Sequence, residues 1–232
     1  MEVLKRRLEQ ESAAATKKDQ ANDLMVKYAN PLARSAFDLQ SRLYNIANGH
    51  SGGADPEYFR MNTLYLLAEF LGWLEIVRRE IQFLDLEGEA SARGLKRQLH
   101  ELQRRLARTG TESTGDLMYL YWGQQRAIGE VMIVARPDAP ARGAGPSSEC
   151  IGYAKSVERQ GEPNFSKWFD RIGGQIDQLR QARQPGKKIQ LPHRLVYLQS
   201  DLVDLINLLD PNKIRLPGER GKLTSYGFHA NS

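Results

Sequence analysis

The chain has 232 residues, of which 41% are hydrophobic and 26% charged, so it is long and apolar enough to bury a core. Its single cysteine, Cys150, excludes an internal disulfide framework. No apolar run reaches the roughly 20 residues of a membrane-spanning helix, and the charged N-terminus lacks the apolar segment of a secretory signal. These features predict a cytoplasmic protein. Because its net charge is +5, peripheral attachment to the inner membrane stays open.

The first 27 residues predict an exposed helical arm. Leu4, Leu8, Ala15 and Met25 form a thin apolar stripe, with a gap near Glu11. The stripe is too interrupted for a coiled coil, which needs three or four sustained heptads. A frayed tail is therefore the alternative interpretation of this segment.

Two helices are expected after the arm. Pro31 suits the first turn of a helix, so it predicts the start of a new one, and apolar residues then recur every three or four positions over residues 32–46. Residues 55–57 combine a capping Asp, a proline and a Glu, which favours a second helix start. The apolar stripe over residues 63–84 is wide, so we expect this helix to lie at the centre of a bundle.

The rest of the chain predicts four more helices, over residues 95–106, 117–131, 169–179 and 192–209. Residues 113–116 match a capping box ahead of the second of these. Two apolar runs, 132–134 and 151–157, are too short for periodicity to separate strand from helix. Proline and glycine mark residues 137–149 as a flexible loop.

The sequence therefore predicts an all-α fold, a multi-helix bundle of about six helices. We divide it into an arm (1–27), a bundle domain (28–212) and an irregular basic tail (213–232). The four histidines are isolated, none has a Glu three residues before it, and Cys150 has no nearby histidine. We therefore expect no metal site, no cofactor and no catalytic residue.

Basic residues cluster in one predicted helix. Six of them surround a single Glu101 and give a local charge of +5, equal to that of the whole chain. They are Arg93, Lys96, Arg97, Arg104, Arg105 and Arg108. Such a stripe suits an acidic protein partner, nucleic acid or an anionic membrane surface. No aromatic residue lies among them in sequence, so base stacking is not indicated.

A second hypothesis is a polar site inside the bundle, formed by Glu69, Arg78, Arg126 and Glu130. Arg126 and Glu130 are four residues apart, and Gly123 and Gly129 would permit close approach of a helix or a ligand. The alternative is a solvated face with ordinary ion pairs between helices.

Two stretches, 28–46 and 70–85, resemble a family of bacterial helical proteins that is frequent in actinobacteria and has no assigned reaction. The first carries Pro-Leu followed by Asp-Leu-Gln-Ser-Arg-Leu-Tyr-Asn-Ile, and the second carries Gly-Trp-Leu-Glu-Ile-Val-Arg-Arg-Glu-Ile-Gln-Phe-Leu. The likeness would cover residues 28 to about 216. It implies one coherent helical domain and identifies no catalytic residue.

We therefore expect a non-enzymatic helical interaction or scaffold protein, which associates with itself and binds an acidic partner through the basic helix. The first alternative is a helical enzyme or ligand-binding bundle that uses the Glu/Arg interior site. The second is a peripheral membrane or RNA-associated protein.

Overall fold

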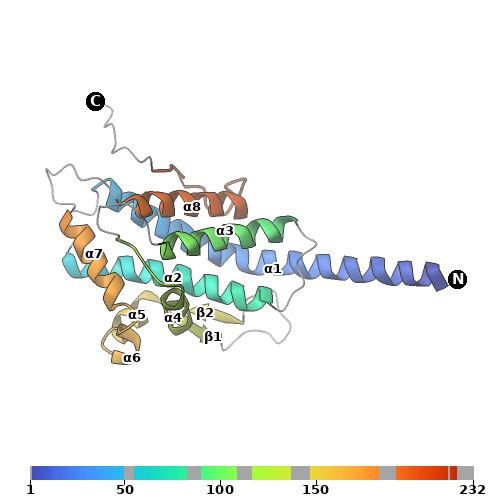
Figure 1. Cartoon of the computed structure of the whole chain (residues 1–232), viewed down its shortest axis with the longest axis horizontal. Coiled ribbons are helices and arrows are strands. Elements are labelled where there is room, and N and C mark those ends of the chain that lie inside the picture. The colour runs from blue at the N-terminus through green and yellow to red at the C-terminus, as the bar shows by residue number, and fades with distance from the viewer. Residues whose placement is uncertain are drawn as a thin grey trace.

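A computed structural model of the chain describes residues 2–49, 55–82, 90–108, 117–136, 147–182, 192–218 and 220–223. Within them the fold is all-α apart from one small sheet, so the predicted fold class is confirmed. The bundle is built from α1 (Glu2–Ala47), α2 (Pro56–Gln82), α3 (Ala90–Ala107) and α8 (His193–Leu209). Figure 1 shows these four helices running side by side, with the smaller elements gathered around α2.

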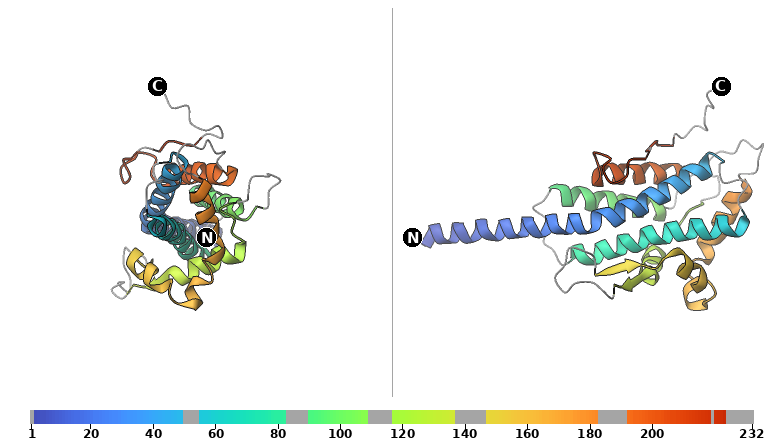
Figure 2. Two further views of the ribbon diagram at one scale, coloured as in Figure 1. Left: turned by 90° about the vertical axis from the view of Figure 1, so that its left-hand side faces the viewer. Right: turned by 180° about the vertical axis from the view of Figure 1, so that it is seen from behind.

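Helix α1 is continuous from Glu2 to Ala47, so the prediction of a new helix at Pro31 is wrong. A proline inside a helix lacks the amide that would bond to the carbonyl four residues earlier, which costs about 3 kcal/mol. The next turns offset this cost, because Leu32, Ala33 and Ala36 are fully buried. The N-terminal half of α1 extends beyond the bundle as an arm, seen in Figures 1 and 2. The side chains of its predicted apolar stripe lie outside the described residues, except that of Ala15, which is exposed.

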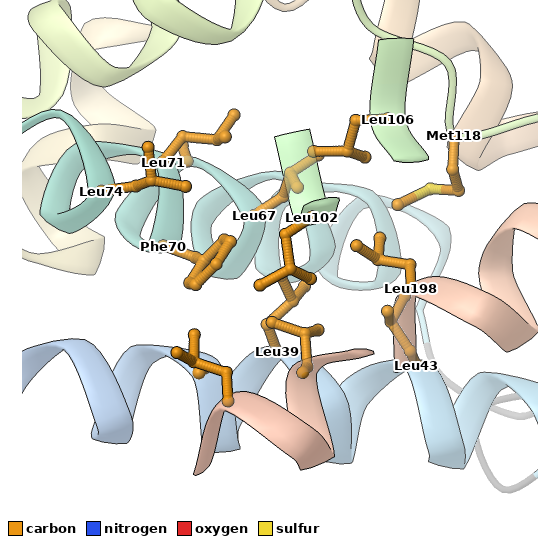
Figure 3. Close-up of a cluster of buried hydrophobic side chains, with 14 of the residues drawn as sticks. Leu39, Leu43, Leu67, Phe70, Leu71, Leu74, Leu102, Leu106, Met118 and Leu198 are labelled. Atoms are coloured by element: carbon orange, nitrogen blue, oxygen red, sulfur yellow. The ribbon is translucent and has the colours of Figure 1, made fainter. Parts of the chain in front are cut away.

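The core lies between the four long helices, and Figure 3 shows its centre. Leu39 and Leu43 of α1 meet Leu67 and Phe70 of α2, and leucines of α3 and α8 close the cluster. Each fully buried leucine stabilises the fold by roughly 1.5–3 kcal/mol relative to an exposed one. Helix α2 packs against α1 and against four smaller elements, so its predicted central position is confirmed. These are α4 (Trp122–Met132), β2 (Ser148–Cys150), α5 (Tyr153–Arg159) and α7 (Asp170–Ala182).

The region after α3 departs from the expected helix over residues 117–131. Helix α4 (Trp122–Met132) begins five residues later. Met118 has a φ of 65°, a left-handed conformation that a helix cannot contain, and Leu120 instead donates its amide to the Leu106 carbonyl at the end of α3. The capping box at 113–116 lies outside the described residues.

The run at 132–134, left open by the sequence, is divided between two elements. Met132 ends α4, and β1 (Ile133–Ala135) pairs antiparallel with β2 (Ser148–Cys150), with Ile133 opposite Cys150. Strand β2 begins within the stretch 137–149 that was predicted as loop, whose residues 137–146 lie outside the described residues. Strand β2 packs on α2.

Three further helices complete the domain: α5 (Tyr153–Arg159), α6 (Pro163–Ser166) and α7 (Asp170–Ala182). Beyond α8, the described residues 211–218 and 220–223 have no helix or strand, but several of them still pack on the bundle. Asp210 accepts the amides of Ile214 and Leu216, and its carboxylate pairs with the buried Arg220. The described part of the C-terminal segment is therefore irregular in backbone yet anchored by an internal ion pair.

Candidate functional site

The exposed side of α3 carries most of the basic residues predicted from the sequence. Spacings of three and four residues place its exposed side chains on one face, which we call the α3 stripe. Its members are Arg93, Lys96, Arg97, His100, Arg104 and Arg108. From the first to the last of them the stripe spans about 22 Å at the helical rise. One acidic residue, Glu101, lies beside it and pairs with Arg104 through two hydrogen bonds.

Arg105 belongs to a different surface. Its guanidinium donates to Asp201 of α8 at 2.9 Å and lies 4.8 Å from the centre of the Tyr197 ring. Its side chain therefore joins α3 to α8 and does not belong to the α3 stripe.

The C-terminal end of α3 is fixed by buried polar side chains. Arg194 of α8 donates to the carbonyls of Arg105, Arg108 and Leu117, at 2.6–3.1 Å. Helix C-terminal carbonyls have no partner within their own helix, and a guanidinium satisfies them and complements the helix dipole. The Gln125 amide of α4 donates to the Gln103 carbonyl. The stripe is therefore presented on a helix that is held at one end by two neighbours.

An aromatic side chain borders the stripe, which the sequence had not indicated. Trp122, the first residue of α4, stacks on His100 with ring centres 5.5 Å apart and planes 29° apart, and it is 42% exposed. Helical spacing places Arg97 and Arg104 beside His100, and Arg126 one turn beyond Trp122. No aromatic residue lies among the basic residues in sequence, but the tertiary fold brings Trp122 to His100 from 22 positions along the chain.

A second cation–aromatic cluster adjoins the end of α3. Arg171 of α7 lies 4.9 Å from the Tyr119 ring and 4.6 Å from the Tyr121 ring, and Arg194 lies 5.1 Å from the Tyr119 ring. Tyr121 is 51% exposed. A hydrogen bond from Arg171 holds the pKa of the Tyr121 phenol below its usual value. Tyr121, the neighbour of Trp122 in sequence, thus adds a second exposed aromatic ring, which lies against Arg171.

The predicted interior polar site is not formed. Arg126 and Glu130 are 52% and 47% exposed on α4 and stand 4.0 Å apart. Arg78 pairs with Glu75 on its own helix, and Glu69 lies in a separate cluster described below. The reason is the helical turn. Glu69 lies six residues before Glu75, the partner of Arg78, so the two carboxylates are on different faces of α2.

The buried carboxylate of this region is Glu75, which the sequence-based site omitted. Its side chain is 2% exposed and accepts hydrogen bonds from Arg78 and Arg79 at 2.6–2.9 Å. Burial alone would raise the pKa of Glu75, but these hydrogen bonds outweigh it and hold the pKa below its usual value. Arg79 also reaches Glu130 of α4 at 3.5 Å. The network joins α2 to α4, and the four-residue spacing of Glu75 and Arg79 was its signal in the sequence.

Glu69 instead lies on the side of α2 that faces α1 and β2. Burial raises the pKa of Glu69, although the hydrogen bond from Tyr65 lowers it in part. Burial also raises the pKa of Asp38 on α1. The Cys150 thiol of β2 lies 3.6 Å from the Glu69 carbonyl oxygen. Burial and the neighbouring charge of Glu69 raise the pKa of this thiol, so it is poorly suited to act as a nucleophile.

Among the described residues, no group of three or more His, Cys, Asp or Glu side chains is placed to hold a metal ion. None of the described helices combines the length and apolar character needed to cross a membrane. Comparison with protein families, with curated proteins and with solved structures found no match. The resemblance to a bacterial helical family therefore stays an expectation.

Proposed function

We propose that the protein is a non-enzymatic helical scaffold that binds an acidic partner on the α3 stripe. The observation that supports this most directly is the exposure of Arg93, Lys96, Arg97, Arg104 and Arg108 along one face of one helix. Between residues 93 and 108 these cations are accompanied by one carboxylate, that of Glu101, and such a row of cations attracts a polyanion and steers its approach. The clamp formed by Arg194 holds this face in place before any partner arrives.

The test compares two triple variants that remove the same charge from different surfaces. In the first, Arg93, Arg97 and Arg104 of the stripe are changed to Gln. In the second, the matched control, the three exposed residues Arg136, Lys155 and Lys167 are changed to Gln. The salt concentration that elutes each protein from a heparin column reports its general affinity for polyanions.

We expect the stripe variant to elute at clearly lower salt than the control, with both retaining the thermal midpoint of the parent, since exposed arginines contribute little to stability. Equal elution of the two variants would refute the proposal. It would show that net charge, rather than the α3 stripe, governs binding.

The second part of the proposal is self-association through the arm. The described arm side chains, which include Lys5, Glu9 and Thr16, are exposed, and Figure 2 shows the arm apart from the bundle. Most helical stability in proteins comes from packing against other elements rather than from intrinsic propensity, so pairing with a second copy would stabilise the arm.

Thr16→Pro tests this in the full chain, because proline breaks the arm helix without touching the bundle. Thr16→Ala, which keeps the helix, is the control. We expect light scattering to give an oligomer for the parent and the Ala variant, and a smaller species for the Pro variant. A monomer in all three would contradict self-association.

A further inference from the structure

We propose that the acidic partner of the α3 stripe is single-stranded nucleic acid, with an unpaired base stacking on Trp122. The inference rests on the proposed function, since it names the partner of that same surface. It depends on one observation beyond the positive charge: an exposed indole is held against the middle of the stripe by its contact with His100.

The start of α4, which carries Trp122, is secured by hydrogen bonds in addition to the stacking of the ring on His100. The Leu120 backbone amide donates to the Leu106 carbonyl at 2.9 Å, and the Gln125 side-chain amide donates to the carbonyls of Gln103 and Leu120 at 3.0 Å. These bonds secure the start of α4 against the end of α3. The indole is therefore preorganised beside the cations, and binding would not have to order it.

The chemistry of this surface distinguishes nucleic acid from the other acidic partners. Binding to single strands combines a positively charged track for the phosphates with aromatic rings for the bases, and both are present here. Stacking on Trp122 requires a base that is not paired within a duplex. The exposed ring of Tyr121, which follows Tyr119 and Arg171 at the end of the stripe, offers a second stacking surface.

An acidic protein fits this surface less well. The core of a protein–protein interface is depleted of charged residues and enriched in apolar ones. The α3 stripe contains arginines, a lysine and a histidine. The leucines of α3 are buried in the core instead, as Leu99 and Leu102 show. A membrane surface would equally require an apolar face to enter the lipid.

The experiment measures fluorescence anisotropy of a labelled oligonucleotide of about 12 thymidines, titrated with the parent protein and with Trp122→Ala and Trp122→Phe. Phenylalanine keeps an aromatic face, whereas alanine removes it. Stacking on one exposed ring predicts that the Ala variant binds about five- to tenfold more weakly and that the Phe variant retains most of the affinity. Heparin elution of both variants should match the parent, because neither change removes a cation. Circular dichroism at 222 nm checks that both variants remain folded, since Trp122→Ala also removes the ring packed on His100.

The salt dependence supplies an independent readout. The stripe variant, which lacks three arginines, should lower the slope of log affinity against log salt by about 2, whereas Trp122→Ala should leave the slope unchanged. A duplex of the same sequence and a polyglutamate peptide are the competing probes, and both should bind more weakly than the single strand.

Two outcomes would overturn the inference while leaving the proposed function intact. In one, Trp122→Ala binds the oligonucleotide as tightly as the parent, although the stripe variant has lost binding. In the other, polyglutamate binds more tightly than the oligonucleotide, which would identify an acidic protein as the partner. If the stripe variant keeps full heparin binding, the proposed function itself fails.

Discussion

The close approach of α4 to α2 at Gly129 allows a quantitative test of the packing. A Cβ added to Gly129 would lie 2.7 Å from the Leu71 carbonyl oxygen and 3.0 Å from the Glu75 Cβ. Both obstacles belong to α2 at or next to its backbone, so neither can rotate away. Gly129→Ala therefore requires the two helices to separate by several tenths of an ångström.

The expected cost follows from two opposing effects. Overpacking a buried contact costs about 1–3 kcal/mol, and replacing glycine by alanine within a helix returns up to about 1 kcal/mol. Because the closest contact is 2.7 Å to a backbone oxygen, we take the upper part of the first range, about 2–3 kcal/mol, and subtracting about 1 kcal/mol leaves a net loss of about 1–2 kcal/mol. For a chain of this size that corresponds to a thermal midpoint lower by about 2–8 °C.

Gly123, six residues earlier on α4, is the matched control, because an added Cβ there meets no described atom within 4 Å. Gly123→Ala should leave the midpoint unchanged or raise it slightly. The assay is thermal and urea unfolding followed by circular dichroism at 222 nm. The packing argument would be wrong if Gly129→Ala melted at or above the parent, or if the two variants shifted equally.

Three further predictions concern buried ionisable groups. The pKa of Glu69 is raised in the fold, so its contribution to stability is present at acid pH and is lost as the pH rises through the folded pKa. Glu69→Gln should therefore increase the free energy of unfolding at about pH 7 but not at about pH 4, as measured by urea unfolding. The lowered pKa of Glu75 has the opposite sign, so Glu75→Gln should cost about 1.5–3 kcal/mol at neutral pH and progressively less as the pH falls below the ordinary glutamate value. Cys150 should resist a thiol reagent in the native protein and react fully once it is unfolded in guanidinium, because it is half-buried and its pKa is raised; prompt native labelling would contradict this reasoning.

The apolar spacing in the sequence was sufficient to predict the bundle, because each long helix buries one stripe. Leu95, Leu99, Leu102 and Leu106 are all buried as their spacing predicts. Rules based on neighbouring residues were less successful at positions where tertiary packing determines the helix boundary. Pro31 looks like a helix start on local grounds, but the buried residues after it extend the helix through the proline.

The same division applies to the polar residues. The basic character and exposure of α3 follow from spacing alone, whereas the stacking of Trp122 on His100 joins two elements and has no local signature. Glu75 was within reach of sequence reasoning, because it follows Leu71 by four positions within the apolar stripe of α2. A carboxylate at such a position must be paired in the fold, and Arg78 and Arg79 supply the charge.

The distribution of charge adds a kinetic consequence to the proposal. Residues 93–108 carry a charge of +5, which equals the net charge of the whole chain, so the remainder of the chain is neutral in sum. Arg105 is occupied by Asp201, but the rest of this excess faces solvent on one side of the molecule. The protein thus has a directional electrostatic field, which should accelerate association with a polyanion at low salt and orient it toward α3.

The association rate measured by stopped flow should then fall steeply with salt for the parent and the control triple variant, and weakly for the stripe variant. A rate insensitive to salt in the parent would mean that the clustering of charge on α3 plays no part in partner encounter.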